Sequence, residues 1–150
     1  MHTASSIHIR APREKIFATV SDLARWPQVL PHYRAIEFLG KQGERQIVRM
    51  CARRSGLPIS WVSAYLADPQ ALELRFEHLE AWTKGMQVVW MLNPTRDGCR
   101  VEIVHDLHFR VPWLAWLAEP IIGRLFVENI ANKTLRTFKA HLEANGEGAA

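Results

Sequence analysis

Cysteine is scarce in this sequence: the 150 residues include only Cys51 and Cys99. Two thiols this far apart have no spacing typical of a metal site, and they do not make the disulfide framework of a small secreted domain. The N-terminal segment MHTASSIHIRAPRE also lacks the apolar stretch of a signal peptide. These absences favour a reducing, cytoplasmic location.

Long apolar runs and blocks of like charge are also missing. The most apolar stretch, residues 111–127, is interrupted by Glu119, Arg124 and two prolines, so it falls short of the roughly 20 residues of a membrane span. The 19 Lys and Arg against 15 Asp and Glu give a net charge of +4 without a run of five or six like charges. Nucleic-acid binding usually needs a clustered basic stripe, so we expect no nucleic-acid partner.

Several catalytic and cofactor motifs are absent as well. There is no glycine-rich phosphate loop between a strand and a helix, and no Gly-x-Ser-x-Gly elbow. The stretch HDLH holds His105 and His108, but an odd separation on a strand sends them to opposite faces, so they cannot share a metal. We therefore expect no cofactor and no metal.

The residues that are present predict one domain over 1–150, with a polar tail at 143–150 that should fray. A first strand at 5–11 precedes two short helices, at 12–23 and 24–33, the second bounded by prolines. Strands are predicted at 34–40, 45–54, 59–67, 71–79, 85–93 and 99–109, with short turns between them. A final helix over 120–143 repeats apolar positions every four residues. The expected fold class is α+β, a curved antiparallel sheet of about seven strands covered by the long helix.

Alternation along the strands indicates which face of the sheet looks inward. In residues 71–79 the charges of Glu73, Arg75 and Glu77 fall on one face and leave the apolar positions on the other. The same logic places these side chains on the inner face: Trp61, Ser63, Tyr65, Phe76, His78, Trp90 and His105. An unpaired buried polar group costs about 1–3 kcal/mol. The four polar side chains therefore either bond one another in a small network or line a cavity, and their number favours a cavity.

The segments at 11–33, 59–63, 85–92, 98–109 and 123–143 resemble, in this order, the START/SRPBCC superfamily, and more specifically its polyketide cyclase/dehydrase branch, which also contains coenzyme Q-binding proteins. The resemblance covers residues 5 to 143. It implies a helix-grip fold, in which the sheet wraps around the last helix and a hydrophobic cavity lies between them. It also implies either cyclisation and dehydration of a tethered poly-β-ketone chain or the binding of a lipophilic molecule.

One position departs from the family. Aromatase/cyclases of this branch often carry an arginine two residues after the serine of their Trp-x-Ser stretch, and this sequence has Tyr65 there. The positive charge of the family's arginine would then have to come from Arg49 or Arg54 on the preceding strand. Arg54 is the better candidate of the two because it shares a face with Met50, but a solvated arginine at a strand end beside Arg53 is the interpretation that the pattern favours.

If the protein is an enzyme, His105 is the expected general base or acid, because an ordinary histidine titrates near neutrality. Tyr65 and Tyr33 are expected to donate to a developing enolate oxygen, and Ser63 to orient the chain. The catalytic candidates are thus His105, Tyr65, Ser63, Tyr33 and Arg54. The ligand-binding candidates are Trp61, Phe76, His78, Met86, Trp90, Ile103, Phe126, Asn129, Ile130 and Met50.

Partners follow from the same two hypotheses. A cyclase would receive its substrate from an acidic acyl carrier protein, which the mild positive charge suits. A carrier would bind a quinone, a fatty acyl chain or another lipid, with residues 111–118 as its membrane-side gate. The alternatives for that segment are a lid over the cavity mouth, a contact with a partner, or a short helix packed on the sheet edge, of which the packed helix is favoured. The sequence leaves a monomer and a homodimer both open.

Overall fold

The computed structural model describes residues 1–108, 116 and 127–148, without the side chains of Trp82 and of residues 145–148. The helical elements are α1 (Arg13–Ser21), the 3-10 turn η1 (Leu23–Arg25), α2 (Trp26–Val29), η2 (Ala81–Thr83) and α4 (Asn129–Gly148). The strands are β1 (His2–Ile9), β2 (Tyr33–Gln42), β3 (Arg45–Arg54), β4 (Leu57–Asp68), β5 (Glu73–His78), β6 (Gln87–Thr95) and β7 (Gly98–Asp106).

The seven strands form one antiparallel sheet in the order β1-β7-β6-β5-β4-β3-β2. Strands β2 to β7 follow one another as a meander, because the connections between them are short turns, except that η2 lies between β5 and β6. Strand β1 lies beside β7, with Ile9 opposite Cys99 and His2 opposite Asp106. The first strand is thereby brought next to the last one, a long-range pairing that the periodicity of the sequence does not indicate.

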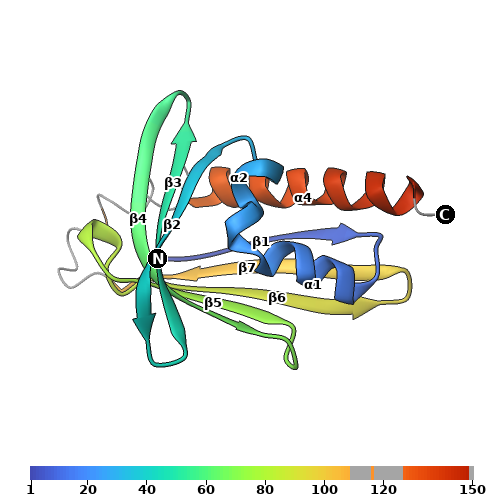
Figure 1. Ribbon diagram of the computed structural model, residues 1–150, viewed down its shortest axis with the longest axis horizontal. Helices are drawn as coiled ribbons and strands as arrows, with labels where there is room; N and C mark the ends of the chain where they lie inside the picture. Colours follow the sequence, from blue (N-terminus) through green and yellow to red (C-terminus); the bar gives the residue numbers. More distant parts are fainter. Residues whose placement is uncertain (109–115, 117–126, 149–150) are drawn as a thin grey trace.

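The sheet curves strongly, and α4 lies along its concave side next to β1 (Figure 1). The buried positions of α4 recur every three or four residues, at Ala131, Leu135, Phe138 and Leu142, with Thr134 buried beside Leu135, which is the stripe of an amphipathic helix. Helices α1 and α2 cover the concave side in front of the sheet (Figure 1). The predicted fold class, a curved antiparallel sheet wrapped around a long C-terminal helix, is confirmed.

The inner faces of the strands also match the prediction. Leu74, Phe76 and His78 are buried on β5, while the intervening Arg75 is exposed and Glu73 and Glu77 are half-buried. Val88, Trp90 and Leu92 on β6 and Val101 and Ile103 on β7 continue the same buried layer. Charged side chains at alternate positions thus fix the register, because a one-residue slip would bury them.

Helix boundaries differ more from the predictions than strand boundaries do. Strand β3 has the predicted bounds, whereas α4 continues to Gly148, past Glu143. Residues 117–126, which include the predicted start of that helix, lie outside the described residues. Among the described residues, no helix combines the length and the apolar character needed to cross a membrane.

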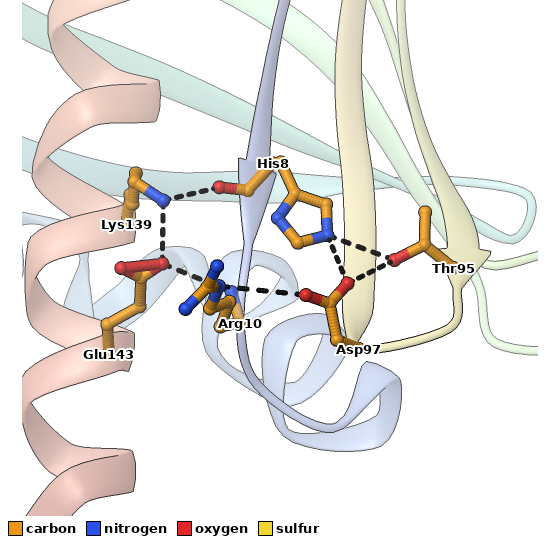
Figure 2. A network of polar contacts seen from close by, with 6 residues as sticks. All are labelled: His8, Arg10, Thr95, Asp97, Lys139 and Glu143. Atoms are coloured by element: carbon orange, nitrogen blue, oxygen red, sulfur yellow. Dashed lines mark hydrogen bonds and ion pairs between the residues drawn. The ribbon is translucent and has the colours of Figure 1, made fainter.

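Two sets of contacts hold the helices on the sheet. Trp26 of α2 is 2% exposed, donates its indole N–H to Val20 O at 3.0 Å, and packs against rings from the sheet and α4, including Trp90 and Phe138. Lys139 of α4, the residue after Phe138, donates to His8 O at 2.6 Å and to Glu143, and Glu143 accepts from the Arg10 amide (Figure 2).

Candidate functional site

A cavity of about 620 Å³ lies between the concave face of the sheet, α2 and α4. Its volume is within the range of small-molecule sites, about 300–1,000 Å³. The exposed lining residues Ser60 and Ala81 mark the side that reaches solvent. Most of the wall is apolar or aromatic, and the lining comprises Trp26, Tyr33, Met50, Ile59, Ser60, Trp61, Phe76, His78, Ala81, Thr83, Met86, Val88, Trp90, Ile103, His105, Val127, Ile130, Ala131 and Thr134.

Two histidines on neighbouring parts of the sheet contribute to this wall. His78 is the last residue of β5, 8% exposed, and its Nδ1 lies 2.8 Å from Thr83 Oγ1 in η2. Its ring stacks on Trp61 with a centroid separation of 6.0 Å and an interplanar angle of 7°. Nδ1 of His78 is engaged in this hydrogen bond with Thr83, so Nε2 is the ring nitrogen that can bond a ligand. His105 comes from β7, where it lies opposite Val88.

Burial keeps both rings neutral. It lowers the pKa of His78 to about 4. It also lowers the pKa of His105 to about 3, with a further contribution from the nearby His78 and a partial offset from Asp106. At pH 7 each ring therefore carries one N–H and one lone pair, and each can donate or accept a hydrogen bond. These values differ from the ordinary histidine pKa that the sequence analysis assumed for His105.

A second polar group lies on the α4 side of the cavity. Thr134 donates to Ile130 O at 2.7 Å, and its Oγ1 lies 2.8 Å from Nε2 of His32, which is 4% exposed. Burial raises the pKa of Tyr33 well above its usual range, and the nearby Thr134 offsets this rise in part. Burial, with Lys133 nearby, lowers the pKa of His32 to about 4. All three side chains are therefore neutral at pH 7.

The structure brings most of the predicted site residues together. Ten of them line the cavity. They come from six strands, from the segment before β6 and from α4, and are Tyr33, Met50, Trp61, Phe76, His78, Met86, Trp90, Ile103, His105 and Ile130.

Four predicted residues are not among the described lining residues. Tyr65 donates its hydroxyl to Ser21 O at 2.7 Å, so this phenol joins β4 to the end of α1. Ser63 is fully buried, and its hydroxyl has no hydrogen-bond partner within the described part of the chain. Arg54 lies at the end of β3 opposite Leu57, and Asn129 is exposed at the start of α4. Phe126 and, apart from the exposed Trp116, the segment 111–118 lie outside the described residues.

Sequence reasoning missed the polar or aromatic lining residues Trp26, Ser60, Thr83 and Thr134, and also His32, the partner of Thr134. Trp26 was hidden by the prolines around it, which marked the segment as a helix boundary and nothing more. Thr134 was recognisable, because it is the polar member of an otherwise apolar stripe on the last helix. His32 had no local signal, since its partner Thr134 lies 102 residues away along the chain.

Comparison with known proteins places this geometry in a family. Residues 1–143 match the family model described as polyketide cyclase / dehydrase and lipid transport. A putative polyketide cyclase of Streptomyces cyaneus is 31% identical over 108 residues, which are 70% of this chain and 71% of that protein. The granaticin polyketide synthase bifunctional cyclase/dehydratase of Streptomyces violaceoruber is 30% identical over 71% of this chain, which spans only 33% of that protein.

Solved structures agree on the fold. The Zhui aromatase/cyclase from Streptomyces sp. R1128 superposes with a TM-score of 0.76 over 95% of this chain and 93% of that chain, at 18% identity. A likeness at this identity concerns the fold alone, whereas the match over residues 1–143 concerns the sequence itself. The chain therefore belongs to the polyketide cyclase/dehydrase and lipid transport family.

Proposed function

We propose that this protein binds a poly-β-ketone chain in its cavity and promotes aldol cyclisation and dehydration. The observation that carries the proposal is the pair of neutral histidines, His78 and His105, on the wall of a cavity otherwise lined by aromatic and aliphatic side chains. Flat rings from Trp26, Trp61 and Trp90 suit a growing aromatic system. Holding the reacting carbons close together can itself supply about 7–11 kcal/mol.

The chemistry required of the histidines is modest, because protons between two carbonyls are already acidic. His105 takes such a proton, the carbanion carbon attacks a second carbonyl carbon, and the resulting alkoxide receives the proton back. In the dehydration a second carbon-bound proton is removed and the hydroxyl leaves with a proton as water. The negative charge that develops on the ligand raises the pKa of His105, which offsets the effect of burial.

His78 contributes from the neighbouring wall. Its Nδ1 is held by Thr83 and its ring is stacked on Trp61, so its orientation is set before a ligand enters. A neutral imidazole in this place can polarise a ligand carbonyl through a hydrogen bond, as preorganised donors do in oxyanion holes. His105 therefore transfers the proton, and His78 orients the poly-β-ketone ligand.

Arg54 has a different role in this proposal. It lies in the β3–β4 hairpin, whose other strand carries the cavity residues Ile59 and Ser60. There it supports contact with an acidic acyl carrier protein that delivers the chain, and the net charge of +4 has the matching sign. Ser63 and Tyr65 take no part in the reaction on this proposal, because neither is a described lining residue.

A second candidate function is the binding or transport of a lipophilic molecule. Two observations favour it: the cavity wall is mostly apolar, and the low pKa values make both histidines weak bases. The family description also includes lipid transport. A carrier would need only the volume and the apolar wall.

Native mass spectrometry of the purified protein, followed by extraction of bound molecules, separates the two functions. An aromatic polyketide supports the enzyme, and a quinone or fatty acid supports the carrier. In parallel, His105→Asn should slow cyclisation of a poly-β-ketone thioester by roughly 100-fold, the usual contribution of a general acid or base. Binding of product should stay within about twofold, because one hydrogen bond is exchanged for another.

His108→Asn is the matched control, since His108 is exposed and lies beyond the end of β7. Its cyclisation rate should equal that of the unmodified protein. An unchanged rate in His105→Asn, together with a co-purifying lipid, would show that the protein is a carrier.

A further inference from the structure

The two histidines of the cavity wall differ in how their rings are held. Nδ1 of His78 lies 2.8 Å from Thr83 Oγ1. Within the described part of the chain, no comparable hydrogen bond reaches the ring of His105. In a neutral imidazole, one nitrogen has a lone pair only when the other carries the N–H. A base at His105 therefore needs an acceptor for the N–H on the side of the ring away from the ligand.

The carboxylate next to His105 in the chain is not this acceptor. Asp106 follows His105 on β7, so its side chain projects from the opposite face of the sheet. There it contacts Nδ1 of His2, and it is 48% exposed. Asp106 acts on His105 only through its charge, which opposes the effect of burial on the pKa of this ring.

Thr3 of β1 lies opposite His105 on the inner face of the sheet. The two residues are paired in the register of β1 and β7. Opposite residues of an antiparallel pair project from the same face with their Cβ atoms about 4.5–5.5 Å apart. Rotation about side-chain bonds can then bring a threonine oxygen within hydrogen-bond distance of an imidazole nitrogen. Thr3 is 9% exposed, whereas its neighbours His2 and Ala4 are exposed.

The Thr3 hydroxyl is buried without a partner. Its Oγ1 is shielded from water and makes no hydrogen bond within the described part of the chain. Such groups are costly and rare in folded proteins, so each one calls for a reason. Ser63 is unpartnered in the same way and lies opposite His78, whose Nδ1 already bonds Thr83. Thr3 is thus the hydroxyl that faces a histidine with a nitrogen to spare.

We propose that Thr3 is a positioning residue for His105: its hydroxyl accepts the N–H of the ring nitrogen away from the cavity, which leaves the lone pair of the other nitrogen for the ligand. The inference rests on the proposed function, in which His105 takes a proton from the ligand. Catalytic hydrogen bonds often close only when a substrate is bound, which fits the open pair of Thr3 and His105.

The bond to Thr3 strengthens as the proton is transferred. The C–H bond between two ligand carbonyls breaks, its electron pair stays on the ligand as an enolate, and the proton joins the ring of His105. The N–H on the far side of the ring then belongs to a charged imidazolium, and hydrogen bonds from charged donors are stronger than those from neutral ones. Thr3 therefore stabilises the protonated base more than the neutral one.

Thr3→Val tests this role, because it removes the hydroxyl at nearly constant side-chain volume. With a poly-β-ketone thioester as substrate, kcat of cyclisation should fall by roughly tenfold or more, the worth of a hydrogen bond to a charged group. KM should not change, since Thr3 is not among the described lining residues. Thr3→Ser keeps the hydroxyl and should keep most of the rate.

Ser5→Ala is the matched control. Ser5 is buried on the same face of β1, but it lies opposite Ile103. Its removal should leave kcat unchanged. An equal loss of kcat in Ser5→Ala and Thr3→Val would mean that any buried hydroxyl of this strand matters to the same extent, which would overturn the inference.

A double-mutant cycle shows whether Thr3 acts through His105. In a His105→Asn background, Thr3→Val should cause no further loss of kcat. An equal loss in both backgrounds, or an unchanged kcat in Thr3→Val alone, would overturn the inference and leave the proposed function in place. If the unmodified protein cyclises nothing, the proposed function fails and the inference fails with it.

The stability of the variant gives an independent check. Because the Thr3 hydroxyl bonds nothing within the described residues, Thr3→Val should not lower the midpoint of urea denaturation. A lower midpoint, or a variant that does not fold, would show that the hydroxyl has a structural partner. Thr3 would then not be reserved for His105, and the inference would be wrong.

Discussion

At the residue scale, the two tyrosines of the chain illustrate how similar side chains on one sheet face acquire different tasks. Tyr33 lines the cavity, whereas Tyr65 donates its hydroxyl to Ser21 O at 2.7 Å. Burial raises the pKa of Tyr65 above its usual range, so the phenol stays protonated and the bond persists across the physiological range. Tyr65 therefore stabilises the junction between β4 and α1.

Tyr65→Phe should consequently lower the free energy of unfolding by about 1–2 kcal/mol, because it leaves the Ser21 carbonyl without this donor. The affinity for 2-naphthol, used as an aromatic probe of the cavity, should not change. Urea denaturation and a 2-naphthol titration followed by tryptophan fluorescence measure the two effects. A loss of affinity in Tyr65→Phe would instead restore the catalytic role expected from the sequence.

At the element scale, polar side chains fasten α4 to the sheet at the end away from the described cavity residues. Lys139 donates to His8 O, and Glu143 accepts from the Arg10 amide (Figure 2). His8 and Arg10 in turn contact Asp97, which lies in the turn between β6 and β7 (Figure 2). The helix cannot shift along β1 without breaking these bonds. They position the wall of the cavity that carries Thr134.

Lys139→Met should remove the ion pair with Glu143 and the bond to His8 O. We expect a loss of about 1 kcal/mol, because the Lys139 side chain is partly solvent-exposed and screened. Hydrogen exchange should accelerate at the Arg10 amide. Arg136→Met, at an exposed position of the same helix, should change neither quantity. Unaltered exchange at Arg10 in Lys139→Met would show that Glu143 holds this amide without help.

At the scale of the whole molecule, three neutral histidines, of which His32 and His78 are buried and His105 is half-buried, make stability depend on pH. The pKa values of His32 and His78 are lowered to about 4 and that of His105 to about 3, mainly by burial. In the unfolded chain histidine titrates near 6.5, so the unfolded state binds more protons between these values. The histidine contribution is complete above about pH 6.5 and is lost as the pH falls toward 4.

The free energy of unfolding should therefore decrease between pH 6.5 and pH 4.5, by up to about 1.4 kcal/mol per pH unit for each histidine. Urea denaturation at several pH values measures this slope. His105→Asn should reduce this slope by up to about 1.4 kcal/mol per pH unit, because one histidine fewer takes up a proton on unfolding. A free energy that stays constant between pH 7 and pH 5 would mean that these rings are solvated in the folded state.

The sequence by itself determined the strands, their inward faces and the helical cover. Charges alternate with apolar residues at Glu73, Arg75 and Glu77, and this local pattern leaves only one face to bury. Eight of the ten expected site residues that line the cavity do so for the same reason, since residues on one sheet face share one environment.

Tertiary structure alone decided the hydrogen-bond partners and the protonation states of the polar side chains on the inner face of the sheet. The pairing of β1 with β7, the bond from Tyr65 to Ser21, and the contact of His32 with Thr134 each join positions that are far apart in the chain. The same holds for the low pKa values of His78 and His105, because burial comes from neighbours that several elements supply. Local pattern specifies which side of a strand turns inward, whereas hydrogen-bond partners and desolvation depend on which distant segments meet.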